Sequence, residues 1–184
     1  MNSQYQGKLT KFSALEPEKM AALLSKWSLD DLFLRLLNSC PAALFTEKTQ
    51  KEWLEEDLKD SPNNSILFTI NTLEEDKPIG FFEIYPSWHH GDAWVGIGIG
   101  ERKNWDKGYG TDAMQIGLKF AFHEINLERV TLGVFGYNAR ALRSYEKAGF
   151  KLEGAHREAL LRDGKRYDAL VMGILKEEWL LINK

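Results

Sequence analysis

The segment Trp94–Gly100 constrains the fold more than any other part of the sequence. Its apolar residues and its glycines alternate: Val95, Ile97 and Ile99 against Gly96, Gly98 and Gly100. Because successive residues of a β-strand point to opposite faces of a sheet, we expect a strand with one apolar face and one bare glycine face. Glycines in a strand often mark the close approach of a ligand or of another backbone. The alternative is that a bulky core side chain from another element fills this space.

A second glycine pattern follows in the sequence. Gly108 and Gly110 lie two residues apart in the segment Trp105–Ala113, between the expected strand and an expected helix. This spacing lets the backbone turn tightly and point several N–H groups in one direction. At a helix N-terminus such donors favour an anion such as a pyrophosphate, and Lys103 and Lys107 add positive charge nearby. The spacing differs from the dinucleotide and Walker motifs; a tight turn without a ligand is the alternative.

The remaining pattern predicts one domain of mixed α/β (α+β) class over residues 1–184. Periodicity and capping signals indicate helices at 17–28, 49–58, 110–125 and 139–148, with Thr49 and Glu52 forming a capping box in the second. Strand patterns cover 66–73, 78–85, 94–100 and 129–135, and Asp163-Gly164 marks a closing hairpin. Residues 60–65 are turn-forming. The order predicts a mixed, mostly antiparallel central sheet flanked by helices.

Composition excludes several classes of function. The formal net charge is -3, so no basic excess points to nucleic acid. Cys40 is the only cysteine, which rules out an intramolecular disulfide and leaves a cysteine-based zinc site unsupported. No apolar run approaches the roughly 20 residues of a membrane span, and residues 1–10 lack the apolar stretch of a secretory signal. We expect a cytoplasmic protein without a metal, a nucleic-acid partner or a membrane partner.

Three segments together resemble a known family. They are Gly108-Tyr-Gly-Thr111, the strand Val130–Phe135, and Asn138-x-x-Ala141-x-x-x-Tyr145-x-Lys147-x-Gly149-Phe150. This set is similar to the GNAT superfamily of N-acetyltransferases. Within it, Glu153-Gly154 and Arg162-Asp-Gly164 are similar to the tail of the branch that contains the ribosomal-protein N-terminal acetyltransferases. The likeness covers residues 77–179, and the helices of residues 14–60 match less closely, where the family usually builds its acceptor site.

The resemblance implies a role for each matching residue. Acetyl-CoA would lay its pantetheine arm along the strand at Ile97–Ile99 and its pyrophosphate on the loop Asn104–Thr111. Tyr145 would protonate the departing thiolate; the alternative is a buried apolar ring. The residues expected to contact acetyl-CoA are Ile97, Gly98, Ile99, Lys103, Asn104, Lys107, Gly108, Tyr109, Gly110, Thr111, Asn138, Ala141 and Arg143.

The general base is harder to find in the sequence. Two positions where the family often carries an acid hold Trp94 and Gly133. Our candidate is Glu83, on a neighbouring strand, which resembles the position of a strand acid in spermidine acetyltransferases. A solvent-facing strand carboxylate is the alternative. His89 and His90, with Asp92 beside them, lie in the following turn and are candidates for acceptor binding or a solvated loop.

The expected activity is transfer of an acetyl group from acetyl-CoA to a primary amine, either a protein N-terminus or a small amine such as a polyamine. The amine would attack the thioester directly through a tetrahedral intermediate. The alternative is a non-catalytic acyl-CoA sensor or regulatory module. The habit of the family also favours a homodimer, with exposed aromatic residues pairing subunits or lining an acceptor cleft: Trp27, Phe33, Phe45, Trp88 and Trp94.

Overall fold

The chain folds around one seven-stranded sheet. The computed structural model describes residues 3–59 and 64–183, and part of the expected break at 60–65 therefore lies outside the described residues. The strand order is β1-β2-β3-β4-β5-β7-β6, and every neighbouring pair is antiparallel except β4–β5. This confirms the mixed, mostly antiparallel sheet. The strands are β1 (Thr10–Ala14), β2 (Ile66–Thr72), β3 (Pro78–Ser87), β4 (Asp92–Ile99), β5 (Arg129–Phe135), β6 (Lys151–Arg162) and β7 (Lys165–Leu175).

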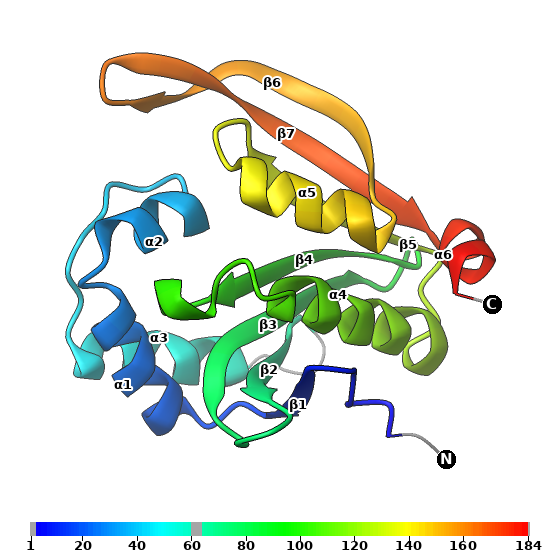
Figure 1. The fold of residues 1–184 in the computed structure, drawn as a ribbon, viewed down its shortest axis with the longest axis horizontal. Coiled ribbons are helices and arrows are strands. Elements are labelled where there is room, and N and C mark those ends of the chain that lie inside the picture. The colour runs from blue at the N-terminus through cyan, green and yellow to red at the C-terminus, as the bar shows by residue number, and fades with distance from the viewer. Residues whose placement is uncertain (1–2, 60–63, 184) are drawn as a thin grey trace.

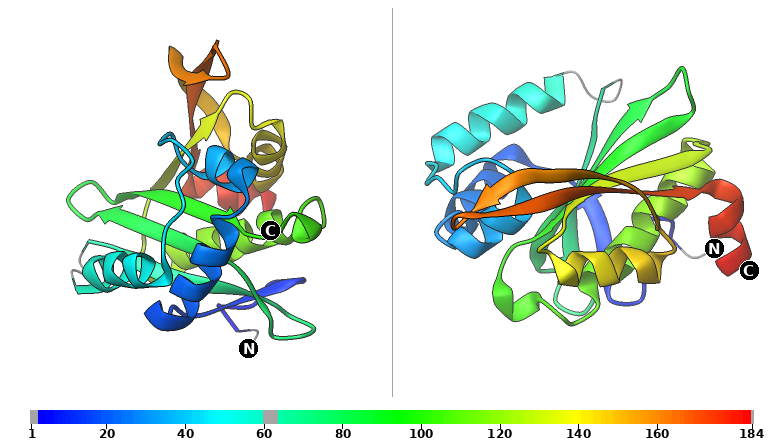
Figure 2. Two further views of the ribbon diagram at one scale, coloured as in Figure 1. Left: turned by 90° about the vertical axis from the view of Figure 1, so that its left-hand side faces the viewer. Right: turned by 90° about the horizontal axis from the view of Figure 1, so that it is seen from above.

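Helices cover both faces of this sheet (Figures 1 and 2). One apolar core joins α4 and α5 to the sheet, and a second joins α1, α2 and α3 to its other face. None of the helices among the described residues has the length and apolar character needed to cross a membrane. The helices are α1 (Pro17–Trp27), α2 (Asp31–Leu37), α3 (Glu47–Lys59), α4 (Tyr109–Lys119), α5 (Ala139–Ala148) and α6 (Lys176–Ile182), with short helical turns at Arg102–Asn104 and Phe120–Glu124.

Three elements and one cap differ from the sequence prediction. Strand β1 and helices α2 and α6 were not predicted, because five and seven residues are too short for a clear periodic pattern. Asp30 caps α2 by accepting the backbone N–H groups of Leu32 and Phe33. The capping box at Thr49 is wrong: Thr46 Oγ1 accepts the Thr49 N–H at 3.2 Å, so α3 begins one turn earlier.

The glycine face of β4 is not bare. Strand β3 lies antiparallel to β4 and places Phe81 opposite Gly98 and Glu83 opposite Gly96. A Cβ atom at Gly98 would lie 2.6 Å from the Phe81 ring, and one at Gly100 would lie 2.1 Å from the Trp27 ring. Bulky neighbours therefore fill the space over these two glycines, as the alternative interpretation held. A bound molecule meets the strand at its edge.

β4 has an open edge because it pairs with β5 over only part of its length. They pair in parallel over only three residues, from Asp92↔Arg129 to Trp94↔Thr131. Beyond this point β4 stays paired with β3 up to Ile99, and β5 stays paired with β7 up to Phe135. The sheet therefore opens between its two central strands while each half remains intact.

The β6–β7 hairpin extends beyond the sheet and reaches α2 (Figure 1). Arg35 Nη2 in α2 lies 2.6 Å from Asp163 Oδ1 at the hairpin tip, and Arg162 donates to the carbonyls of Asn38 and Cys40. From the other side, the Tyr137 hydroxyl donates to the Arg35 carbonyl at 2.6 Å. The hairpin and the β5–α5 connection thus hold α2 in place beside the opening of the sheet.

The exposed aromatic residues are fewer than expected. Trp27 and Phe33 are buried in the core under α1 and α2, so they cannot pair subunits. Phe45 packs edge-on against Trp53. Trp88 and Trp94 do stand on the surface.

Candidate active site

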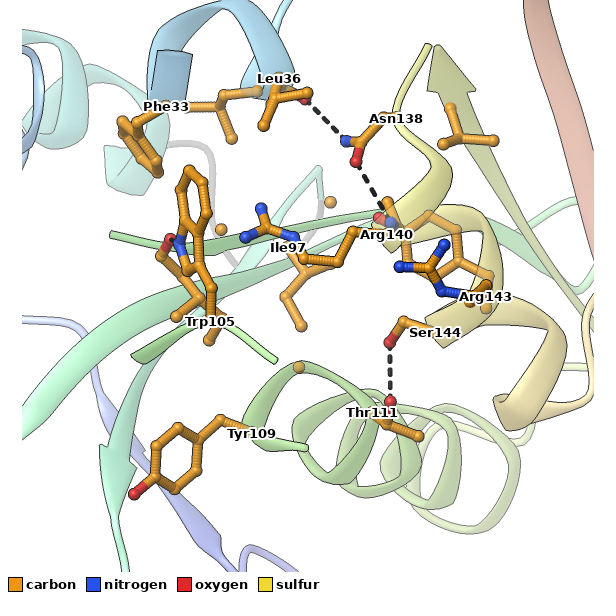
Figure 3. Close-up of a pocket in the computed structure, with 18 of the residues that line it drawn as sticks. Phe33, Leu36, Ile97, Trp105, Tyr109, Thr111, Asn138, Arg140, Arg143 and Ser144 are labelled. Atoms are coloured by element: carbon orange, nitrogen blue, oxygen red, sulfur yellow. Dashed lines mark hydrogen bonds between the residues drawn. The ribbon is translucent and has the colours of Figure 1, made fainter. Parts of the chain in front are cut away.

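A pocket of about 490 Å³ occupies the opening between β4 and β5. Its walls come from β4, the loop before α4, the first turns of α4 and α5, and the apolar side of α2 (Figure 3). All residues expected to contact acetyl-CoA, together with Glu83 and Tyr145, line it except Lys103 and Lys107. The acceptor candidates His89, His90 and Asp92 do not line it. Segments that lie far apart in the sequence therefore meet in one cavity.

The edge of β4 presents backbone groups to this pocket. The Gly100 N–H donates to the Ile79 carbonyl, toward β3. Since residues two apart in an antiparallel strand direct their N–H and C=O groups to the same side, Gly98 and Gly96 also face β3, and Ile97 and Ile99 face the gap. The Ile99 carbonyl accepts the Trp105 indole N–H at 2.8 Å. The N–H and C=O of Ile97 are left to pair with a ligand that lies along the strand.

The glycine turn ends at the N-terminus of α4. Gly108 caps the helix with a left-handed φ of 85°, a conformation that glycine adopts without strain. The N–H groups of the first turn, from Tyr109 to Thr111, have no carbonyl of a preceding turn to pair with and lie in the pocket wall. The Thr111 and Ser144 hydroxyls lie 2.8 Å apart and join this turn to α5. The arrangement suits an anion such as a pyrophosphate.

The positive charge in the pocket comes from α5. Lys103 pairs with Glu101, and neither Lys103 nor Lys107 lines the cavity. Arg140 and Arg143 do so instead, and the Arg140 guanidinium lies 3.5 Å from the centre of the Trp105 ring (Figure 3). Arg140 Nη1 is buried with no hydrogen-bond partner in the described structure, and burial lowers the pKa of Arg140. A buried donor in this state favours an anionic partner.

Arg140 was missed by the sequence reasoning because it occupies an unspecified position of the Asn138-x-x-Ala141 pattern. The only sequence signal was its place two residues after a helix cap. Phe33 lines the pocket and was among the aromatic residues expected at an acceptor cleft, whereas Leu36 and Leu37, which complete this apolar wall, were missed together with α2.

Asn138 holds the start of α5. Its side-chain oxygen accepts the Ala141 N–H at 3.2 Å, and its side-chain nitrogen donates to the Leu36 carbonyl at 3.4 Å. The residue therefore caps the helix, as its type predicts, and ties it to α2 (Figure 3). Both the oxygen and the nitrogen of the Asn138 amide are hydrogen-bonded within the protein, so Asn138 holds α5 and α2 in position as walls of the pocket.

Glu83 projects from β3 toward the open edge of β4. Its Oε2 would lie 2.8 Å from a Cβ atom at Gly96, so the glycine makes room for the carboxyl group. Burial raises the pKa of Glu83 to about 7; a hydrogen bond with Tyr85 opposes this shift, and the charge of Asp57 adds to it. A carboxyl group with this pKa can accept a proton near neutral pH.

Tyr145 lines the opposite wall of the same pocket, one turn further along α5 than Ala141. Burial raises the pKa of its hydroxyl to about 12, and the positive charge of Arg140 acts in the other direction. The phenol is therefore protonated at neutral pH. Its ring also packs against Phe150, so the residue faces the core with one side and the pocket with the other.

Comparison with known proteins decides the family. A family model described as "Acetyltransferase (GNAT) domain" matches residues 11–151. The chain belongs to the GNAT acetyltransferase family. The SPbeta prophage-derived uncharacterized N-acetyltransferase YokL of Bacillus subtilis is 27% identical over 176 residues, covering 91% of this chain and 90% of the relative. A second Bacillus subtilis protein, the probable N-acetyltransferase YjcK, is 32% identical over 113 residues, covering 60% of this chain and 62% of the relative.

Solved structures show the same fold. Spermidine N-acetyltransferase from Vibrio cholerae, in complex with CoA and spermine, superposes with a TM-score of 0.81 at 22% identity, covering 93% of this chain and 98% of that one. An acetyltransferase of the GNAT family from Bacillus anthracis gives a TM-score of 0.78 at 20% identity, covering 95% and 99%. The family match and the relatives named as N-acetyltransferases make the chain an acetyl-CoA-dependent N-acetyltransferase.

The residues present fit acetyl-CoA. The Ile97 carbonyl at the open edge can accept an amide N–H of its pantetheine arm, which leaves the Ile97 N–H for the thioester oxygen, and the first turn of α4 with Arg140 can hold its phosphates. Among residues 3–59 and 64–183 no group of three or more His, Cys, Asp or Glu side chains could hold a metal ion.

Arg140 provides a test of this fit. Replacing it with alanine removes a buried cation whose Nη1 lacks a partner, and a lost charge-assisted hydrogen bond costs about 1.5–3 kcal/mol, or roughly tenfold to a hundredfold in affinity. We expect Arg140→Ala to weaken acetyl-CoA binding by this factor in calorimetry. Lys103→Ala, at a cation paired with Glu101, should change affinity by less than about threefold. If Lys103→Ala weakened acetyl-CoA binding more than Arg140→Ala did, the phosphate contact would belong to Lys103.

Proposed function

We propose that this chain acetylates a primary amine by direct attack on acetyl-CoA, with Glu83 as general base and Tyr145 as general acid. The observation that carries the proposal is the position of the Glu83 carboxyl. It lies beside Gly96 at the open edge of β4 with its pKa raised to about 7, in the same pocket as Tyr145.

In the proposed mechanism each of these residues acts in one step. Glu83 accepts a proton from the acceptor ammonium, and the neutral amine attacks the thioester carbonyl carbon. The Ile97 N–H stabilises the oxyanion that develops, as a fixed backbone donor does in other acyl transfers. The C–S bond then breaks, Tyr145 gives its proton to the departing sulfur, and the amide nitrogen loses its extra proton to water.

The pKa values restrict how the last step proceeds. A free thiol ionises near pKa 8.5, well below the value of about 12 for Tyr145. Proton transfer to a free thiolate would therefore run uphill. In this proposal the Tyr145 proton moves while the C–S bond breaks, and collapse of the tetrahedral intermediate drives the transfer. Tyr145 is afterwards reprotonated from solvent.

In this proposal residues 14–60 form the acceptor side of the site and residues 77–179 hold acetyl-CoA. Two acceptor classes have separate support. Resemblance to the ribosomal-protein N-terminal acetyltransferase branch favours a protein N-terminus, and the fold shared with a spermidine N-acetyltransferase favours a small amine. The homodimer and the cytoplasmic location stay predictions. A sensor that binds acetyl-CoA without turnover is the competing function.

The pH profile tests Glu83. The carboxyl must be ionised to accept a proton, so kcat/KM for the amine should fall below the pKa of about 7 and level off above it, apart from ionisation of the amine itself. Glu83→Gln should remove this inflection and lower kcat by about a hundredfold or more. A variant that keeps both the rate and the inflection near pH 7 would exclude Glu83 as the base.

Substitution of Tyr145 tests the acid. Tyr145→Phe keeps the ring against Phe150 and removes only the hydroxyl. We expect kcat to fall by about a hundredfold, while calorimetry shows acetyl-CoA affinity within about threefold of the wild type. Full turnover with unchanged affinity would show that Tyr145 is a packing residue.

A further inference from the structure

Two large aromatic side chains lie exposed beside Glu83. Tyr85 on β3 and Trp94 on β4 are directly paired across the strands, next to the pair Glu83↔Gly96. Residues directly opposite in an antiparallel pair, and residues two apart on a strand, share one face of the sheet. Tyr85 is 40% exposed and Trp94 is 51% exposed, so a continuous aromatic surface leads up to the Glu83 carboxyl.

Both rings border the reaction site. The Tyr85 hydroxyl donates a hydrogen bond to the Glu83 carboxyl. The Trp94 ring crosses toward β5, where a Cβ atom at Gly133 would meet its Cζ3 at 3.9 Å, and Gly133 itself lines the pocket. Trp94 is also the last residue of β4 that pairs with β5. Its ring therefore lies at the base of the opening, within reach of an amine that approaches Glu83.

The charge on this surface is negative. Asp57 of α3 lies near Glu83 and Tyr85, because its carbonyl accepts the Ser65 hydroxyl at 3.1 Å just before β2, which pairs with β3 at Glu83. The charge of Asp57 raises the pKa of Glu83 and of Tyr85, after the larger effect of burial. No lysine or arginine is among the groups that shift either one, and Asp57 is exposed and forms no ion pair with a described residue. Aromatic faces and unpaired carboxylates together attract organic cations.

We infer that Tyr85 and Trp94 form the acceptor platform and that the acceptor is a small alkylammonium ion with a second positive charge, its reacting end at Glu83 and its other end toward Asp57. This rests on the proposed function. The Trp94 face holds the ammonium form of the acceptor, and its apolar surface covers the alkyl chain. Because the acceptor binds as an ammonium ion, it must lose a proton before it can react. The adjacent Glu83 carboxylate accepts that proton.

The neighbouring strand leaves room for the Trp94 ring. Gly133 on β5 has no side chain, so the ring can extend over it toward the pocket.

Two amines of equal chain length test the aromatic platform and the second positive charge separately. Pentylamine carries one positive charge and cadaverine carries two. With saturating acetyl-CoA, we expect the wild type to acetylate both and to favour cadaverine by about tenfold in kcat/KM. Trp94→Ala should lower kcat/KM for both amines by roughly threefold to thirtyfold, with KM for acetyl-CoA unchanged. Trp94→Phe should retain most of the rate, because it keeps an aromatic face. Asp57→Asn should reduce the rate with cadaverine and leave that with pentylamine within twofold.

The matched control is Trp88→Ala, at an exposed tryptophan in the β3–β4 turn outside the platform, which should change neither amine by more than about twofold. Equal rates with the two amines in the wild type, or an unchanged rate in Trp94→Ala, would overturn the inference and leave the proposed function standing. Acetylation of peptide N-termini with no turnover of either amine would do the same. Absence of acceptor-dependent CoA release with amines and peptides alike would overturn both.

Discussion

The opening between β4 and β5 is the constraint on which the rest of the structure depends. Two central strands of a sheet would ordinarily pair along their whole length, because an unpaired buried peptide group costs about 1–3 kcal/mol. Here the pairing stops after three residues, and the Ile97 peptide groups face a pocket. Helices α4 and α5 point their first turns into the same gap, and the β6–β7 hairpin holds α2 beside it. The elements around the gap are those that a bound acyl donor would bridge.

Glycines on β4 determine what lies beside that edge. Each faces a bulky neighbour, with Gly98 under Phe81 and Gly96 next to Glu83. One substitution at Gly96 would displace the carboxyl group, whereas one at Gly98 would displace a core ring. The same cross-strand register that fills the core under α1 thus places a carboxyl of raised pKa at the edge. The alternation of glycine and apolar residues along β4 therefore determines both the packing of the core under α1 and the position of the Glu83 carboxyl group.

Sequence reasoning located most of the pocket because its signals are local. The turn at Gly108 and the cap at Asn138 need particular residue types for backbone reasons, and both stand where expected. The contents of the glycine face depend on contacts with Phe81 and Trp27, which no local pattern reveals. Arg140 was overlooked for the same reason: its stacking on Trp105 joins α5 to a loop far away in the sequence. Lys103 was favoured by proximity in the chain, yet its charge is taken up by Glu101.

The central claim is that acetyl-CoA completes the open edge of β4, and the backbone amide of Ile97 tests it most directly. Amide hydrogen exchange followed by NMR should show the Ile97 N–H protected on addition of acetyl-CoA, with its chemical shift moved. The Gly98 N–H, which already faces β3, provides an internal reference and should change little. An Ile97 amide that exchanges at the same rate with and without saturating acetyl-CoA would contradict the account and place the acyl donor elsewhere.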